Sequence, residues 1–185
     1  MGGFFDIDFN DKQPDNWKLQ LMIVTPIMRP EVQHFCKIPY PDHPKGCPNF
    51  NSGRLDCPPI APLFDKIFDL QSPYKIYAVV NEFDLKSHTE KMEYLHPTWS
   101  NRQCRNLLYW QNSARKQLKM KVNYFLNRTD DYQSFPTLKD VGYEAVYIPE
   151  AMGIDVTKTM KNAGIILEWP PINIVRQIAF LAKRK

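Results

Sequence analysis

The sequence contains little glycine, no long apolar run and few recognisable enzyme motifs. Gly occurs 7 times and Pro 16 times, which is the reverse of the usual order. No segment approaches the roughly 18 consecutive apolar residues of a membrane-spanning helix. The N-terminal segment MGGFFDIDFNDKQPD contains several acids and no apolar core, so we expect no secretory signal. These absences predict a cytoplasmic protein with reduced thiols and no membrane partner.

The signatures of several large enzyme classes are missing as well. The chain carries no HExxH, GxSxG, P-loop or GxGxxG pattern. These absences argue against the hydrolases, nucleoside triphosphatases and dinucleotide-binding enzymes that use such motifs. Apolar residues make up 43% and aromatic residues 13% of the chain, so it is not a disordered tail protein. Its 185 residues suit a single domain, residues 1–185, that needs no disulfide to fold.

Hydrophobic periodicity predicts a mixed fold, α/β or α+β, in which helices flank a small sheet. Strands are predicted at 17–25, 75–83 and 165–169, and a strand or a helix at 172–182. Helices are predicted at 65–70, at 100–127 after a Ser100–Gln103 capping box, and from Asp155 to about Ala163 with Gly164 behind it. Residues 84–97 are polar and undecided in form, and 129–139 are expected to form a loop.

One segment holds most of the proline and most of the cysteine. Nine of the sixteen prolines fall between Pro26 and Pro62. Because proline opposes both helix and central strand, residues 26–62 are predicted to form one long loop. The same segment contains Cys36, Cys47 and Cys57, in the pattern Cys-x10-Cys-Pro-x8-Cys-Pro-Pro. Ligation of these thiols to a common metal would hold so long a loop in order.

The fourth cysteine, Cys104, follows 47 residues after Cys57, in the first turn of the helix predicted at 100–127. A helix N-terminus stabilises a thiolate, and the flanking Arg102 and Arg105 act in the same direction. Cys104 is therefore predicted to be a metal ligand or a nucleophile. The alternative is that Cys36 and Cys104 are buried small apolar residues, as free cysteines often are.

Four cysteines in a cytoplasmic protein favour a metal or a reactive site over disulfides. Their spacing lacks the tight Cys-x2–4-Cys knuckles of zinc fingers and the dense run of bacterial ferredoxins. Proline directly after a cysteine is, however, common at iron–sulfur ligands. We predict one [4Fe–4S] cluster, with Zn²⁺ as the alternative cofactor and a metal-free protein as a third interpretation. The predicted ligands are Cys36, Cys47, Cys57 and Cys104.

Two segments of the chain match a known pattern. CPNFNSGRLDCPPIAP, residues 47–62, is similar to CPNYGKxxxCPPxxP, and PEAMGIDVTKTMKNAG, residues 149–164, is similar to PSMEAxGIDVxxTxxNAG. In both, the chain resembles the uncharacterised "predicted metal-binding protein" family, domain of unknown function 2284. The resemblance implies a cysteine-bound metal or iron–sulfur centre in a small α/β domain, with Cys47 and Cys57 as ligands. It names a cofactor class and no reaction, because no activity is established for the family.

The chain departs from that family's pattern in two ways. Family members have an earlier cysteine closer to the first motif than Cys36 is to Cys47. They also carry a further cysteine cluster before the GIDV segment, and this chain has none there. One metal centre is therefore expected, and Cys36 and Cys104 are candidates by chemistry and not by motif.

Other candidate residues carry charge or a metal-binding ring. Residues 100–128 hold seven positive charges and no acid, within a chain of net charge +4 and pI near 8.8. On an unbroken helix one basic face would consist of Arg102, Arg105, Tyr109, Asn112, Lys116 and Lys119, with Trp99 and Trp110 close by. That face would bind RNA phosphates, dock an acidic partner or simply be solvated. His34 and His43 would serve as zinc ligands, or remain exposed. Asp155 is predicted as a helix N-cap, with a role as a base as the alternative.

Three functions are compatible with these patterns. The first is an iron–sulfur protein acting in electron transfer, or as a redox or accessory subunit of a larger complex. The second is a binding module, stabilised by zinc or a cluster, that docks RNA or a partner protein through residues 100–128. The third is an enzyme whose cluster has three cysteine ligands and one open iron, acting on a sulfur-containing substrate. The sequence does not decide between them.

Overall fold

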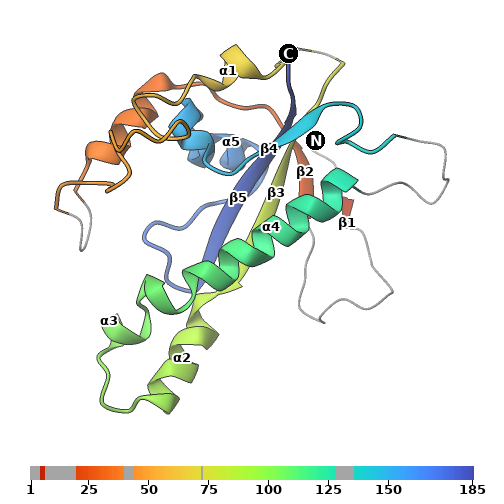
Figure 1. Cartoon of the computed structure of the whole chain (residues 1–185). Coiled ribbons are helices and arrows are strands. Elements are labelled where there is room, and N and C mark those ends of the chain that lie inside the picture. The colour runs from red at the N-terminus through yellow and green to blue at the C-terminus, as the bar shows by residue number, and fades with distance from the viewer. Residues whose placement is uncertain (1–4, 7–19, 40–43, 72, 128–135) are drawn as a thin grey trace.

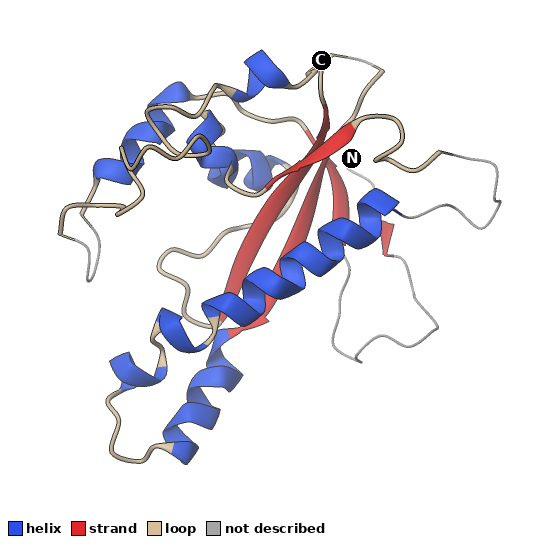
Figure 2. Ribbon diagram, in the orientation of Figure 1, coloured by secondary structure: helices blue, strands red, loops and turns tan. Residues whose placement is uncertain are grey.

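The computed structural model describes residues 5–6, 20–39, 44–71, 73–127 and 136–185 (Figure 1). Its centre is one antiparallel sheet in the order β1-β2-β3-β5-β4. The strands are β1 (Phe5–Asp6), β2 (Gln20–Val24), β3 (Ile76–Asp84), β4 (Tyr143–Val146) and β5 (Ile174–Lys183). Helices pack around this sheet, so the predicted mixed fold with a small sheet is confirmed (Figure 2).

The helices lie on both sides of the sheet and beyond one end of it. The α-helices are α1 (Phe64–Ile67), α2 (Leu85–Leu95), α3 (Asn101–Cys104), α4 (Gln111–Asn127) and α5 (Val156–Asn162). Three 3-10 helices complete the described part: η1 (Pro30–Lys37), η2 (Leu107–Tyr109) and η3 (Pro149–Met152). None of the helices in the described residues is long and apolar enough to cross a membrane.

Strand periodicity assigns the two faces of the sheet. Along β3, Ile76, Ala78 and Val80 point to one face, where they join a buried cluster with Phe64 of α1 and Met160 of α5. On the opposite face, Val79 packs with the buried residues Leu118, Val122 and Phe125 of α4. Figure 1 shows α4 lying along that second face. The segment that carries Cys36, Cys47 and Cys57 is anchored on the α1–α5 side.

The predicted helix 100–127 is wrong as a single element. The chain forms α3, η2 and α4 in succession, with breaks at Arg105 and Trp110. The Asn106 side chain accepts a hydrogen bond from the Leu108 backbone N–H (3.0 Å), and the Arg105 guanidinium donates to the Pro171 carbonyl (2.8 Å). The Asn106 bond pairs a backbone N–H at the start of η2, and the Arg105 bond ties the break to the segment before β5.

The other element predictions have mixed outcomes. β2 and β3 occupy the segments predicted as strands, and 172–182 resolves into the strand β5. The undecided segment 84–97 contains α2, the predicted strand at 165–169 is absent, and β4 was not foreseen. The predicted loop 26–62 includes the eight-residue helix η1. Residues 7–19, 40–43 and 128–135 lie outside the described residues, with the parts of the predictions that fall on them.

A buried lysine on α4 gives a pH-dependent prediction. Lys121 is 3% exposed, and its burial lowers the pKa of the ammonium group, an effect that nearby Glu82 only partly opposes. The unfolded chain therefore binds more protons between the two pKa values, so stability rises with pH across that window. We expect Lys121→Met to raise the free energy of unfolding at pH 7 by about 1 kcal/mol, and by less at pH 9.5.

Urea unfolding at the two pH values measures this difference. Lys119→Met is the matched control, because Lys119 lies two positions before Lys121 on the same helix and is exposed. Its effect should stay within about 0.5 kcal/mol. Destabilisation by Lys121→Met at both pH values would contradict the prediction.

Candidate functional site

The 3-10 helix η1 places Cys36 on a defined edge. Side chains at i and i+3 eclipse one another in a 3-10 helix, so Pro30, Gln33 and Cys36 share one edge of η1. The Gln33 amide donates to the carbonyl oxygens of Ala151 (2.7 Å) and Ala61 (3.3 Å). That edge therefore faces two segments at once, the turn after Cys57 and the helix η3.

Cys47 is tied to Cys36 through the backbone. The Cys47 N–H donates to the Cys36 carbonyl oxygen over 2.7 Å. Gly46, just before it, is buried, has φ of +79°, and packs directly on the backbone of Cys36 and Lys37. A side chain at this position would overlap the Cys36 carbonyl oxygen. Glycine is thus required for the close approach of the two cysteines.

Cys57 lies in a turn that Gln33 also holds. Its carbonyl oxygen accepts from the N–H groups of Ile60 (3.1 Å) and Ala61 (2.9 Å), and the side chain is buried. Arg54 and Asp56, beside it, form a two-pronged ion pair at 3.0 and 2.9 Å on the surface. The Gln33 bond to Ala61 links this turn to the edge of η1 that carries Cys36.

The three thiols interact with one another and with a carboxyl group. Burial raises the pKa of the Cys36 thiol, and Cys47, Cys57 and Glu150 raise it further because each would place negative charge nearby. Burial also raises the pKa of Cys57, and Asp56 adds to that effect while Arg54 opposes it. Cys47 and Cys57 thus lie near enough to Cys36 to act on the pKa of its thiol, and the expectation that the three share one metal stays a prediction.

No metal-binding geometry is preformed there. Among the His, Cys, Asp and Glu side chains of the described residues, no group of three or more is arranged to hold a metal ion. All four cysteines are free thiols. His34 lies on η1 and is exposed, on a different edge from Cys36, and His43 lies outside the described residues.

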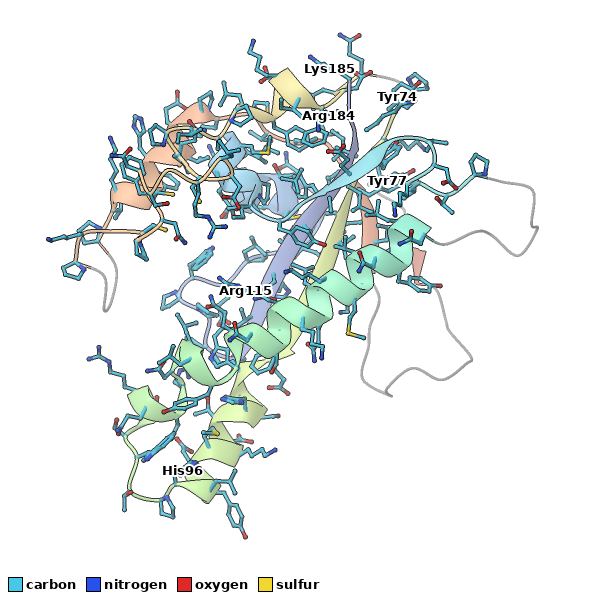
Figure 3. The ribbon with its side chains drawn as sticks, viewed as in Figure 1. Tyr74, Tyr77, His96, Arg115, Arg184 and Lys185 are labelled. Carbon is cyan, nitrogen blue, oxygen red and sulfur yellow. The ribbon has the colours of Figure 1, made fainter. Side chains whose placement is uncertain are left out.

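Cys104 lies in another part of the molecule. It is fully buried at the end of α3, which packs on α2 at the far end of the structure from α1 (Figure 1). Figure 3 labels His96, the C-cap of α2, at this end and Arg184 at the opposite one. The predicted fourth ligand is therefore not brought to the other three. Cys104 ends a four-residue helix and does not begin a long one, so the expected stabilisation of its thiolate by a helix N-terminus does not apply.

The predicted basic face is divided between elements. Lys116 and Lys119 are exposed on α4, whereas Arg102 lies on α3 and Arg105 bonds the carbonyls of Pro171 and Ile172. Tyr109 packs its ring on Trp99, at 5.1 Å between centroids. The set Arg102, Arg105, Tyr109, Asn112, Lys116 and Lys119 does not form one continuous helical face.

The GIDV segment braces the cysteine segment. Gly153 has φ of +80° and lies close to Pro30, and its carbonyl oxygen accepts from the Arg29 N–H (2.7 Å). Asp155 caps α5 by accepting from the Lys158 N–H (3.0 Å) and pairs with the Arg29 guanidinium (3.2 Å). The predicted N-cap role of Asp155 is confirmed. Residues 47–62 and 149–164, the two segments with the family resemblance, thus both contact η1 or Arg29 directly before it.

The N-cap role of Asp155 can be tested by substitution. We expect Asp155→Ala to lower the free energy of unfolding by about 1–2 kcal/mol, because α5 loses its cap. Asp155→Asn should cost much less, since asparagine caps equally well and the lost ion partner Arg29 is 44% exposed. Chemical denaturation of the two variants measures the difference. Equal losses would show that the charge of Asp155, and not its cap, is what matters.

An apolar cavity of about 510 Å³ borders the cysteine segment. Its walls include Leu55 and Asp56, which precede Cys57, Ile148, which is the N-cap of η3, and Met152, which is the last residue of η3. Arg184 also lines the cavity, and its guanidinium forms an ion pair with the Glu144 carboxylate of β4 (3.2 Å). The volume is in the range of small-molecule sites.

Sequence reasoning missed two residues of this site, Gln33 and Glu150. Gln33 gives no signal in the sequence because its role depends on contacts made after folding. Glu150 lies within the segment that resembles the family motif, which is the one signal that pointed to it. Comparison of the chain with models of known families, with curated proteins and with solved structures finds no match.

Proposed function

We propose that this protein binds one [4Fe–4S] cluster through Cys36, Cys47 and Cys57, and acts in electron transfer or as a redox or accessory subunit of a larger complex. The observation that supports this most is the convergence of three thiols from three turns of one segment. Hydrogen bonds of Gln33 and the close packing of Gly46 hold those turns together.

The donor set suits a soft metal centre. Thiolates favour zinc, copper(I) and iron–sulfur clusters. A structural zinc site takes four protein ligands, whereas iron–sulfur centres accept ligands other than cysteine, as histidine does in Rieske centres. When bound, the cluster supplies a one-electron redox couple. The raised pKa values of Cys36 and Cys57 mean that the chain must release protons as its thiols take up metal.

Reconstitution of the anaerobically purified protein with iron and sulfide tests the proposal. We expect brown protein with about four iron and four sulfide per chain. The matched control is a triple variant with Cys36, Cys47 and Cys57 replaced by serine, which should stay colourless. A wild-type protein that stays colourless and binds one zinc would overturn the cluster proposal and support the zinc alternative.

The α2–α3 end supports a protein partner. Tyr94, near the end of α2, is 84% exposed, and Leu108, in η2, is 80% exposed. Their sequence neighbours Leu95 and Leu107 are also exposed. Apolar side chains gathered on a surface mark interaction sites. We propose that the larger complex contacts the protein there, in the reducing cytoplasm that its four free thiols favour.

RNA binding is the competing interpretation of this end. Because the basic residues are divided between α3 and α4, we expect no salt-dependent RNA binding at low ionic strength. A fluorescence-anisotropy titration with a single-stranded RNA checks this. Binding that disappears when Lys116 and Lys119 are both replaced by glutamate would support the RNA alternative instead.

The cavity supports an enzymatic role as a second candidate function. Its apolar lining, beside Cys57 and η3, would admit a small sulfur-containing substrate near an open iron. A thiol-bearing ligand should then perturb the electron paramagnetic resonance signal of the reduced cluster. An unchanged signal with every such ligand would leave electron transfer as the better proposal.

A further inference from the structure

The 3-10 helix η2 presents three exposed apolar side chains in succession. Leu107 is 47%, Leu108 80% and Tyr109 49% exposed, and no residue of η2 is buried. The Asn106 side chain caps η2 by accepting from the Leu108 N–H (3.0 Å), so the turn that displays these side chains is held in place. Contact of apolar side chains with water is unfavourable, and a partner that covers them recovers that free energy. We therefore take η2 as the centre of a candidate interface.

Ring contacts join η2 to the end of α2. The Tyr109 ring lies 5.1 Å from the Trp99 ring, centroid to centroid, and Trp99 is stacked on His96 at 3.9 Å. His96, labelled in Figure 3, is the C-cap of α2 and directly follows Leu95, which is 53% exposed. Leu95 and η2 are thus connected through three rings in contact.

Arg105 joins η2 to the segment before β5. It lies two positions before η2, and its guanidinium donates to the carbonyl oxygens of Pro171 (2.8 Å) and Ile172 (3.2 Å). The Ile172 side chain is itself exposed. The exposed apolar residues that these contacts connect form what we call the η2 surface: Leu95, Leu107, Leu108, Tyr109 and Ile172.

The cations beside the η2 surface stand on both sides of it in the chain. Arg102 on α3 precedes η2, and Arg115 and Lys116 on α4 follow it; all three are exposed. From Tyr94 to Asn127 the chain contains no Asp or Glu. The apolar centre therefore has a basic rim that is divided between two helices.

Two acids lie at the edge of this region, and local hydrogen bonds hold both. Glu93 accepts from the Asn101 side chain (3.1 Å), and Glu168 accepts from the backbone N–H groups of Ile172 (3.0 Å) and Asn173 (3.3 Å). The three exposed cations on α3 and α4 outnumber these two acids. The rim is therefore net positive, and its electrostatic complement is an acidic partner.

We propose that the η2 surface binds an acidic amphipathic segment of a protein partner. Apolar side chains of that segment cover Leu107 and Leu108, and its Asp and Glu side chains face the cations of α3 and α4. This inference rests on the proposed function, because it names the chemistry of the partner that the proposed function places at the α2–α3 end. An apolar centre with a polar rim is the arrangement of protein interfaces, whereas the phosphates of RNA would leave the leucines uncovered.

Selection from a displayed library of random peptides, on the immobilised full-length protein, tests the assignment. The peptides have about 12 residues, which is enough for a short helix. We expect the enriched peptides to combine Asp or Glu with Leu, Ile or Phe, and we measure their binding by fluorescence anisotropy. Leu108→Ser changes a residue that is 80% exposed, so it spares the fold, and it should weaken binding about tenfold or more. Lys116→Glu should weaken binding about threefold or more and reduce its dependence on salt.

Leu55→Ser and Lys66→Glu are the matched controls. Leu55 is 78% exposed in the cysteine segment, and Lys66 is exposed on α1. Each control makes the same chemical change outside the η2 surface. Both should bind the enriched peptides within about twofold of wild type.

Each other outcome contradicts the inference in a recognisable way. A selection that enriches no peptide, or only peptides whose binding is unchanged in Leu108→Ser and Lys116→Glu, refutes it. Peptides without acids, or binding that depends on Leu108 and not on Lys116, refute the acidic character of the partner. A single-stranded RNA that displaces the peptides, and whose own binding is lost in Lys116→Glu but not in Leu108→Ser, would assign the surface to RNA. None of these measurements requires a cluster, so a failed reconstitution refutes the proposed cluster without deciding the partner.

Discussion

Replacing Cys57 by serine should remove the iron and sulfide from the reconstituted protein, whereas replacing Cys104 by serine should leave both unchanged. Cys57 is one of three thiols gathered by η1 and the turns beside it, and Cys104 lies on α3 at the other end of the structure. Losing one of three thiolates leaves too few ligands for a stable centre. Iron and acid-labile sulfide are measured per chain after gel filtration.

The two substitutions are closely matched. Both side chains are buried, Cys57 at 7% and Cys104 at 0% exposed, and serine changes each in the same way. General destabilisation should therefore affect both variants, and circular dichroism shows whether each is folded. Loss of the cluster in folded Cys104→Ser would contradict the ligand assignment and restore the four-cysteine prediction.

Gly46→Ala should disrupt the site through the backbone. An added side-chain carbon would overlap the Cys36 carbonyl oxygen and lie 2.8 Å from the Lys37 carbonyl carbon, and φ of +79° is unfavourable for alanine. We expect a loss of about 2–4 kcal/mol in the free energy of unfolding and at least tenfold weaker cluster retention. Chemical denaturation and iron content measure the two effects.

Gly53→Ala is the control for Gly46→Ala. Gly53 has nearly the same backbone conformation, with φ of +82°, but an added carbon there meets nothing within 4 Å. It should cost only the conformational strain, about 1 kcal/mol, and leave the cluster in place. If the two alanine variants behave alike, the contact between Gly46 and Cys36 does not position the cysteines.

Local signals in the sequence predicted the ends of helices well. The capping box of Ser100 and Gln103 is present, Asp155 caps α5, and Gly164 follows that helix with φ of +88°. These features depend on residues at most a few positions apart, so the sequence alone contains them. The strands β2 and β3 were found for a similar reason, since their apolar residues are consecutive.

Features that depend on distant contacts were not predictable in the same way. The break after α3 is stabilised by the bond from Arg105 to Pro171, 66 positions away. Residues 165–169 have the composition of a strand, yet no strand of the sheet pairs with them. The short edge strand β4 is recognised only by its pairing with β5. In each case tertiary contacts override local propensity.

The same distinction between local signals and distant contacts applies to the residues of the candidate site. Cys36, Cys47 and Cys57 were predictable as a group because one proline-rich segment contains them all. Cys104 was wrongly grouped with them on the basis of residue type, since its distance from the loop depends on how α2 and α3 fold together. Glu150 follows Cys57 by 93 positions, and its approach to Cys36 depends on the packing of η1 on η3.

The central claim, a cysteine-held iron–sulfur centre in the segment from η1 to α1, is tested most directly by spectroscopy of the wild-type protein. The measurement is electron paramagnetic resonance of the anaerobically reconstituted protein before and after reduction by dithionite, with iron, sulfide and zinc counted on the same sample. The proposal predicts a sample without a signal before reduction and with the signal of a reduced four-iron cluster afterwards, at about four iron and four sulfide per chain. A protein with no signal in either state, and with zinc or no metal bound, would contradict it.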